Sequence, residues 1–126
     1  HVYPFLTGEN IEATVEQCKA LLQKLISESE YKIGLFGIGP DGHTSGILPE
    51  SPAVTDPHFI SSYQGGAYMR VTTTPALIAK LDEVVVYAVG ENKKPALSSL
   101  KEDLPLHIQP AQALKQAGKF IIFNDN

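Results

Sequence analysis

At 126 residues, the chain is long enough for one small domain, residues 1–126, with a sizeable hydrophobic core. Its net charge of −4 and the lack of an apolar run long enough to cross a bilayer argue against binding to nucleic acids or membranes, so a phosphorylated ligand would need a local basic cluster. The single cysteine, Cys18, excludes intrachain disulfides and cysteine-based zinc sites, and it suits a reducing compartment such as the cytoplasm.

The first quarter of the chain predicts one long amphipathic helix. Residues 2–6 are expected to form a short strand that Thr7 and Gly8 end. From about Glu9, apolar residues recur at steps of four and three, which is the stripe of a helix ending between residues 27 and 30. The stripe consists of Ile11, Val15, Cys18, Leu22 and Leu25. Because Cys18 lies on this stripe, we interpret it as a core residue and not as a nucleophile.

An apolar run and the glycine-rich loop that follows it are the most distinctive stretch. Residues 33–38 predict a strand in a sheet covered on both faces. The glycines at positions 37, 39 and 42 and the proline at 40 cannot continue a strand or start a helix unaided. The loop carries Asp41 and His43 two residues apart, and backbone N–H groups in such loops can hold an anion or an oxyanion. A plain strand-to-helix turn is the alternative reading.

The middle of the chain predicts an excursion from the main sheet. Residues 44–48 have room for about one helical turn before Pro49. Residues 59–63 and 68–73 are expected to pair as a hairpin around a glycine-containing turn. Alternation along the second arm places Arg70 with the polar side chains, where an arginine is often simply solvated.

The second half of the chain alternates helices with strands. Thr74 is a plausible cap for a helix over residues 75–81, and another helix is expected from about 95 to 100. A third helix is predicted over residues 110–117. Buried strands are predicted over residues 84–89 and 120–123. This alternation favours a parallel sheet with helices packed on it.

The loops that follow the strands should meet at one edge of that sheet. Ligands of open parallel sheets bind beyond the carboxyl ends of the strands. The loop over residues 37–43 follows one strand and the loop over residues 90–93 follows another, so Asp41, His43 and Lys93 can converge, and Arg70 could join them. The alternative for Lys93 is a solvated surface charge.

Four segments of the chain resemble one known family. Gly-Ile-Gly-Pro-Asp-Gly-His-Thr at residues 37–44, followed by Pro49, resembles the signature loop of the 6-phosphogluconolactonase and glucosamine-6-phosphate isomerase family. Arg-Val-Thr-Thr-Thr-Pro at residues 70–75 resembles its Arg-Ile-Thr-Leu-Thr segment. Gly-Glu-Asn-Lys at residues 90–93 resembles its Gly-x-x-Lys, and Pro-Ala at residues 110–111 resembles its late Pro-Ala. The segments follow the family's order, and the likeness is closest to the lactonases.

This resemblance implies a fold, a substrate class and a set of site residues. The fold would be a Rossmann-like, mainly parallel α/β sheet with flanking helices, of the NagB/RpiA/CoA-transferase-like type. His43 would be the acid–base residue and Asp41 its neighbour, while Arg70 and Lys93 would bind phosphate. The substrate-binding loop would include Gly37, Gly39 and Gly42. The expected reaction is hydrolysis of 6-phosphogluconolactone, or a related sugar-phosphate lactone of the pentose phosphate pathway, by water activated at His43 without a cofactor or metal.

Two other functions and an incomplete domain remain open. The deaminase branch of the family places a glutamate five residues beyond the histidine, where this chain has Leu48, which weighs against an aldose–ketose isomerase or deaminase. A third reading is a sugar-phosphate-binding module without turnover. Family members are roughly twice this length, so the chain resembles their C-terminal half. It is therefore expected to fold, to show little lactonase activity by itself, and to self-associate through an exposed strand edge.

Overall fold

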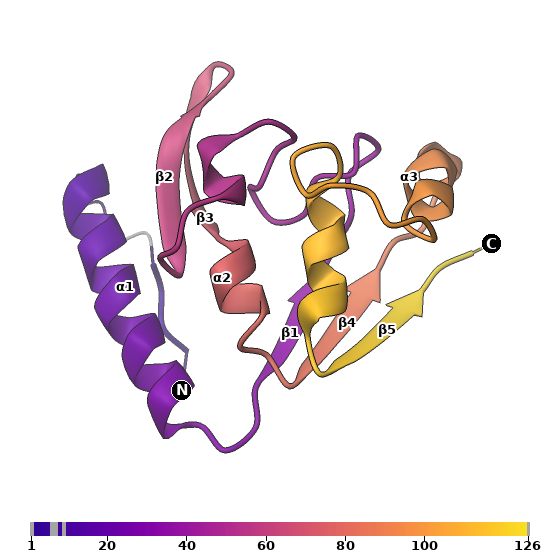
Figure 1. Cartoon of the computed structure of the whole chain (residues 1–126). Helices are drawn as coiled ribbons and strands as arrows, with labels where there is room; N and C mark the ends of the chain where they lie inside the picture. Colours follow the sequence, from indigo (N-terminus) through magenta and orange to yellow (C-terminus); the bar gives the residue numbers. More distant parts are fainter. Residues whose placement is uncertain (1, 6–7, 9, 126) are drawn as a thin grey trace.

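A three-stranded parallel sheet and a separate hairpin form the framework of the protein. The computed structural model describes residues 2–5, 8 and 10–125. Strands β1 (Ile33–Phe36), β4 (Glu83–Tyr87) and β5 (Lys119–Phe123) lie in the order β1-β4-β5, and both pairs are parallel (Figure 1). Strands β2 (Ile60–Gly65) and β3 (Tyr68–Thr73) form an antiparallel hairpin. The predicted parallel sheet and the predicted hairpin are thus confirmed, with shifts of a few residues at the strand ends.

The helices are short except for the first. Helix α1 spans Ile11–Glu28, and the two other α-helices, α2 and α3, span Pro75–Ile78 and Lys94–Ser99. The described part of the chain also contains three 3₁₀ helices: η1 (Pro52–Val54), η2 (Glu91–Lys93) and η3 (Pro110–Gln116). The helix expected over residues 110–117 is therefore present in the 3₁₀ form, and α2 ends three residues before its predicted end.

Helix α1 packs on the hairpin and not on the three-stranded sheet (Figure 1). The Asn10 side chain caps it by accepting a hydrogen bond of 2.8 Å from the backbone N–H of Ala13. Val15 and Cys18, on the predicted stripe, pack with Ile60 of β2. Cys18 is only 2% exposed, and burial raises the pKa of its thiol, so its interpretation as a core residue is confirmed. The predicted start of the helix, Glu9, lies outside the described residues.

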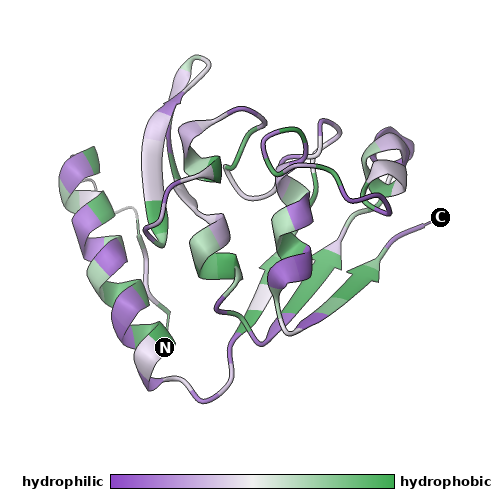
Figure 2. Cartoon of the chain, viewed as in Figure 1, coloured by the Kyte–Doolittle hydropathy of each residue, from purple (hydrophilic) through white to green (hydrophobic). Residues whose placement is uncertain are grey.

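The main hydrophobic core lies on one face of the three-stranded sheet. Helices α2, η3 and α3 are all on this side of the strands, and the strands themselves are strongly apolar (Figures 1 and 2). Val84 and Val86 of β4 are fully buried beneath these helices, and Leu114 of η3 is fully buried in the same core. Burying side chains of this size contributes roughly 1.5–3 kcal/mol each, so this layer holds the sheet and its helices together.

The opposite face of the same sheet is largely uncovered. Ile33 and Leu35 of β1 are 62% and 76% exposed, and Tyr87 of β4 and Phe123 of β5 are 65% and 57% exposed. The expectation that the strand beginning at Ile33 belongs to a sheet covered on both faces is therefore wrong for the described residues. An apolar strand sequence shows that two faces are apolar, but it does not show what covers them.

Two predicted elements do not form. Residues 2–5 make no strand, and Leu6 lies outside the described residues. Residues 44–48 do not make a helical turn, because Ser45 has a positive φ of 51° and Thr44 and Ile47 form an isolated antiparallel bridge. A left-handed residue cannot continue a right-handed helix.

Hydrogen bonds from the hairpin hold this turn in place. The Tyr63 hydroxyl donates to the carbonyl oxygen of Gly46 at 2.5 Å and accepts from the N–H of Leu48 at 3.3 Å. The Thr72 hydroxyl accepts from the N–H of Gly46 at 2.9 Å. A Cβ atom at residue 46 would lie 3.0 Å from the Cβ of Thr72, so glycine allows the close approach. The β2–β3 hairpin thus fixes the chain directly after the glycine-rich loop.

Replacing Tyr63 with phenylalanine should destabilise the protein by about 1–3 kcal/mol. The carbonyl oxygen of Gly46 and the N–H of Leu48 would both lose the buried hydroxyl group that is their hydrogen-bond partner. Urea denaturation followed by circular dichroism measures this change in the free energy of unfolding. Tyr68→Phe is the matched control, since Tyr68 is 73% exposed on the same hairpin. Equal stability of the two variants would show that the Tyr63 hydroxyl does not hold the turn.

Candidate functional site

The glycine-rich loop leaves β1 at the carboxyl edge of the sheet and closes on itself. The N–H of Gly39 donates to the carbonyl oxygen of His43 at 2.8 Å, and the N–H of Gly42 donates to that of Gly39 at 3.0 Å. The Thr44 hydroxyl donates to the carbonyl oxygen of Gly37 at 2.9 Å. The N–H groups of Gly39 and Gly42 are thus already hydrogen-bonded within the loop. An anion held by the loop would therefore need other donors than Gly39 and Gly42.

Two of the glycines are required by close contacts. A Cβ atom at residue 39 would lie 2.1 Å from the imidazole ring of His43, so only glycine lets the ring lie against the backbone there. Gly42 has a φ of +82°, and a Cβ atom there would lie 2.7 Å from the side chain of Gln109. The glycines shape the loop so that His43 folds back over it.

Asp41 and His43 form a close pair within the loop. The Oδ1 atom of Asp41 lies 2.6 Å from Nδ1 of His43 and also accepts from the His43 backbone N–H at 3.2 Å. Partial burial acts to raise the pKa of Asp41, but these hydrogen bonds from His43 outweigh it and lower that pKa below its ordinary value. Asp41 is therefore ionised at neutral pH and can only accept. The hydrogen of the neutral ring then sits on Nδ1, and Nε2 keeps a free lone pair.

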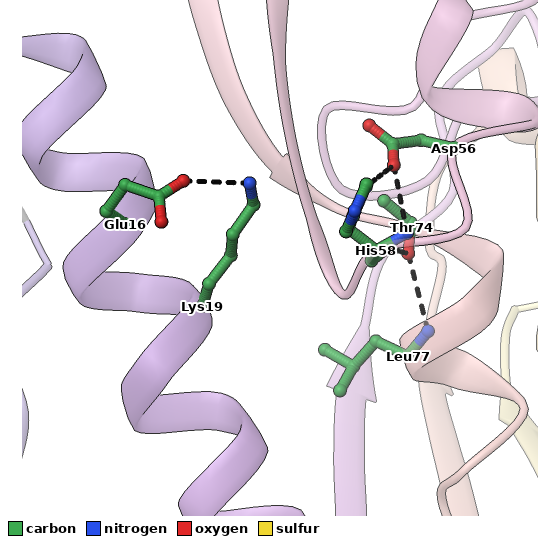
Figure 3. A network of polar contacts seen from close by, with 6 residues as sticks. All are labelled: Glu16, Lys19, Asp56, His58, Thr74 and Leu77. Atoms are coloured by element: carbon green, nitrogen blue, oxygen red, sulfur yellow. Dashed lines mark hydrogen bonds and ion pairs between the residues drawn. The ribbon is translucent and has the colours of Figure 1, made fainter.

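A second pair with the same spacing shows what is special about the first. Asp56 and His58 also make a contact from Oδ1 to Nδ1, at 2.9 Å, and the backbone N–H of His58 donates to the same oxygen at 2.9 Å (Figure 3). The carbonyl oxygen of His58 accepts from Thr74, the residue that caps α2. This pair precedes β2 and lies next to a helix start. The Asp-x-His contact is thus a local feature of the chain, and the position at the sheet edge distinguishes His43.

Residues near the end of the chain brace the loop from behind. Gln109 is buried, and its Nε2 donates to the carbonyl oxygen of Ala96 at 2.8 Å and to the Ser99 hydroxyl at 3.0 Å. The N–H of Ala111 donates to the carbonyl oxygen of Gly42 at 3.0 Å. Sequence reasoning missed Gln109, because no local pattern marks a glutamine that will be buried. Its only signal is its place directly before the Pro-Ala segment.

Lys93 lies at the same sheet edge as the loop. It ends η2, which follows β4 after residues 88–90, and its backbone N–H donates to the carbonyl oxygen of Gly90 at 2.9 Å. The N–H of Gly90 in turn points at both carboxylate oxygens of Asp125, at 3.2 and 3.1 Å, which ties the end of β4 to the segment after β5. The strand order puts β1 next to β4, so the predicted convergence of the two loops at one edge is present.

Arg70 lies on the hairpin face that contacts the turn after the loop. It stands directly opposite Tyr63 in the β2–β3 register and two residues before Thr72. Tyr63 and Thr72 are the two hairpin residues that form hydrogen bonds with Gly46. Its side chain runs over Gly65, and its Nε atom is buried without a hydrogen-bond partner among the described residues. Within that part of the chain, no hydrogen bond or ion pair joins Arg70 or Lys93 to His43. The four predicted side chains therefore lie on connected elements but do not contact one another as one cluster.

Two hollows in the surface border helix α3. One of about 370 Å³ borders Asp41 and Gly42 and reaches α3 and Gln109. A larger one of about 770 Å³ lies between α3 and β5, away from the loop, and neither is lined by His43. The described residues contain no group of three or more His, Cys, Asp or Glu side chains that could hold a metal ion, and no helix among them is long and apolar enough to cross a membrane.

Solved structures with this fold are about twice as long as the chain. It superposes on 6-phosphogluconolactonase from Trypanosoma brucei with a TM-score of 0.71 at 24% identity, covering 98% of this chain and 58% of that one. A structure described as a monomeric glucosamine-6-phosphate deaminase of the NagB superfamily gives a TM-score of 0.78 at 18% identity, covering 95% and 54%. At these identities the likeness establishes the fold, which is the predicted one.

Sequence comparison identifies the family. The proteins named 6-phosphogluconolactonase from Bos taurus and Chlamydia pneumoniae are each 30% identical to this chain. The bovine match extends over 121 residues, 90% of this chain and 47% of the relative, and the chlamydial match over 83 residues, 64% and 32%. The chain thus spans about half the length of the bovine relative and about a third of the length of the chlamydial one. The family model described as glucosamine-6-phosphate isomerases/6-phosphogluconolactonase matches residues 1–122, so the chain belongs to this family.

Proposed function

We propose that this chain supplies the acid–base part of a site that hydrolyses 6-phosphogluconolactone or a related sugar-phosphate lactone. Its family membership and its lactonase relatives support the reaction class. The single observation that carries the proposal is the Asp41–His43 pair on the closed glycine loop at the carboxyl edge of the sheet. It leaves Nε2 of His43 with a free lone pair at the place where parallel sheets bind ligands.

The proposed chemistry is general-base attack of water on the lactone carbonyl. Nε2 of His43 takes a proton as the water oxygen bonds to the carbonyl carbon, and the resulting imidazolium faces the Asp41 carboxylate. When the bond from that carbon to the ring oxygen breaks, Nε2 returns the proton to the departing oxygen. The products are a carboxylic acid, which ionises in water, and a hydroxyl group. Asp41 keeps the ring in the productive tautomer throughout.

Arg70 and Lys93 are the proposed phosphate ligands. Phosphate needs charge-assisted donors, and the partnerless Nε of Arg70 supports a role for its guanidinium in holding an anion. Lys93 stands at the sheet edge beside the loop. The glycines at 37, 39 and 42 would contribute by shaping the loop and leaving room for the sugar. Leu48 packs against the hydrophobic core, so the position of the deaminase glutamate holds no acid, which favours the lactonase over the deaminase reading.

Replacing His43 with alanine should lower lactone hydrolysis above the spontaneous rate by about 10²–10⁴-fold, the usual contribution of a general base. His58→Ala is the matched control, because His58 has the same pairing with an aspartate but lies away from the sheet edge. We expect the wild-type rate to be low, since this chain presents only part of a surface that must hold the sugar on several sides. Wild-type activity retained in His43→Ala would remove this histidine from the mechanism.

A chain that does not turn over can still be tested by binding. Titration with 6-phosphogluconate, the reaction product, should shift the NMR signals of the His43 ring and leave those of His58 in place. A chain that neither hydrolyses the lactone nor binds the product would contradict the proposed function.

Replacing Asp41 with asparagine should reduce hydrolysis at neutral pH by roughly tenfold to 10⁴-fold, the upper value being the cost of losing the orienting carboxylate in a serine-protease triad. The asparagine amide can present its NH₂ group to Nδ1, which moves the ring hydrogen to Nε2. Initial rates at pH 7, together with circular dichroism to verify folding, test this. If Asp41→Asn keeps full activity, tautomer control by this residue is not part of the reaction.

Alanine at Arg70 or Lys93 should weaken binding of 6-phosphogluconate by about tenfold or more, since hydrogen bonds to charged groups contribute about 1.5–3 kcal/mol. Binding of unphosphorylated gluconate should change little. Lys94→Ala is the control, because Lys94 is the next residue and is paired with Glu91 at 2.7 Å. Titration calorimetry with both ligands decides the matter: equal losses for the two would show that these cations do not read phosphate.

A further inference from the structure

The two loops of the candidate site are not bonded directly to each other. Among the described residues, no hydrogen bond joins the glycine-rich loop, residues 37–43, to residues 90–93. The pairing of β1 with β4 aligns the two segments, but its register ends at Phe36 and Val86, before either loop begins. The finer alignment of one loop with the other therefore depends on a third element.

The side chain of Gln109 lies between the glycine-rich loop and α3. Its Cγ atom packs against Gly42, where a Cβ atom would be only 2.7 Å away. Its Nε2 atom donates to the carbonyl oxygen of Ala96 at 2.8 Å and to the hydroxyl of Ser99 at 3.0 Å. Both partners belong to α3, the helix that begins directly after Lys93. Because a carbonyl oxygen can only accept, the NH₂ side of the amide must face this helix.

Burial and a complete set of hydrogen bonds hold Gln109 in this place. The residue is only 3% exposed, and its Oε1 atom accepts from Nε2 of Gln112 at 2.7 Å. Nε2 of Gln112 also donates to the carbonyl oxygen of Glu102, beyond the end of α3, at 2.9 Å. A buried polar network in which every member is satisfied is rigid, and the loss of one member leaves the others unpaired.

Backbone bonds hold the same segment against the loop and the turn that follows it. The N–H of Ala111 donates to the carbonyl oxygen of Gly42 at 3.0 Å, and the carbonyl oxygen of His107 accepts from the N–H of Glu50 at 2.9 Å. The side chain of Gln109 adds the connection to α3. All of these contacts are made within the described residues.

We propose that Gln109 is a positioning residue that sets where Lys93 lies relative to His43. This inference rests on the proposed function, in which Lys93 binds the phosphate group and His43 acts at the lactone carbonyl. One ligand that reaches both groups needs them at a fixed separation, and a misplacement of about 1 Å can cost about 10²-fold in rate. Gln109 acts through these two residues and does not itself contact the substrate.

Gln109→Met tests the structural part of the inference without a ligand. Methionine is flexible and of similar length, so it can keep the contact with Gly42, but it cannot donate to α3. In amide NMR spectra of the ligand-free chain, the signals of His43 and Lys93 should both shift or broaden. Gln112→Met is the matched control, because the side-chain hydrogen bonds of Gln112 reach residues 99, 102 and 109 but not the loop.

The control variant should leave the His43 signal close to its wild-type position. Equal changes in the two variants would overturn the proposal, because they would assign the effect to the whole network and not to Gln109. Unchanged signals of His43 and Lys93 in a folded Gln109→Met protein would overturn it as well. Circular dichroism establishes that each variant is folded.

Titration calorimetry with 6-phosphogluconate and gluconate tests whether this position affects phosphate binding. Gln109→Met should weaken the binding of 6-phosphogluconate by about tenfold, the loss expected for Lys93→Ala, and change the binding of gluconate little. Because Gln109 acts through Lys93, the double variant should bind no more weakly than Lys93→Ala alone. A merely structural role would instead give additive losses that affect both ligands alike, and that result would overturn the proposal.

Ser99→Ala is a milder variant that removes one of the two hydrogen bonds from Gln109 to α3. It should weaken the binding of 6-phosphogluconate in the same direction and by less. Unchanged binding of this ligand in every folded variant would overturn the proposal. A wild type that binds 6-phosphogluconate no better than gluconate would contradict the proposed function, while the ligand-free NMR comparison still decides whether Gln109 links the two loops.

Discussion

The packing of β4 between β1 and β5 is the contact on which the rest of the structure depends. Val84 and Val86 of β4 are fully buried beneath the helices, and backbone pairing on both sides fixes the two neighbouring strands. Because all three strands are parallel, this packing brings their carboxyl ends to one edge. The glycine-rich loop after β1 and residues 90–93 after β4 therefore leave the sheet at the same edge, although they are far apart in the sequence.

The candidate site is held from outside by residues that take no part in the proposed chemistry. Tyr63 and Thr72 of the hairpin fix the turn that follows the loop, and Gln109 and Ala111 support the loop from the other side. Side chains locked by such contacts keep a catalytic pair in one geometry. The Asp56–His58 pair has the same local contact without this setting. The role that we propose for His43 therefore rests on the surroundings of this residue and not on the Asp-x-His spacing itself.

The same sheet has two faces with different consequences. One is closed by α2, η3 and α3 and carries the site at its edge, while the other is apolar and uncovered. Solved structures of about twice the length share this fold, with TM-scores of 0.71 and 0.78.

Local patterns in the sequence were enough to predict most of the elements and the loop. The apolar stripe around Cys18, the hairpin and the glycines around Asp41 and His43 are determined by residues close together in the chain, so their periodicity and backbone freedom are visible directly. The family also followed from the motif at residues 37–44. Only the tertiary structure decided features that rest on distant partners. Ser45 has a left-handed backbone in a turn held by Tyr63, Gln109 is buried behind the loop, and Leu35 is exposed on the uncovered face of the sheet. Each depends on which surfaces meet in space, and that information is spread over the whole chain.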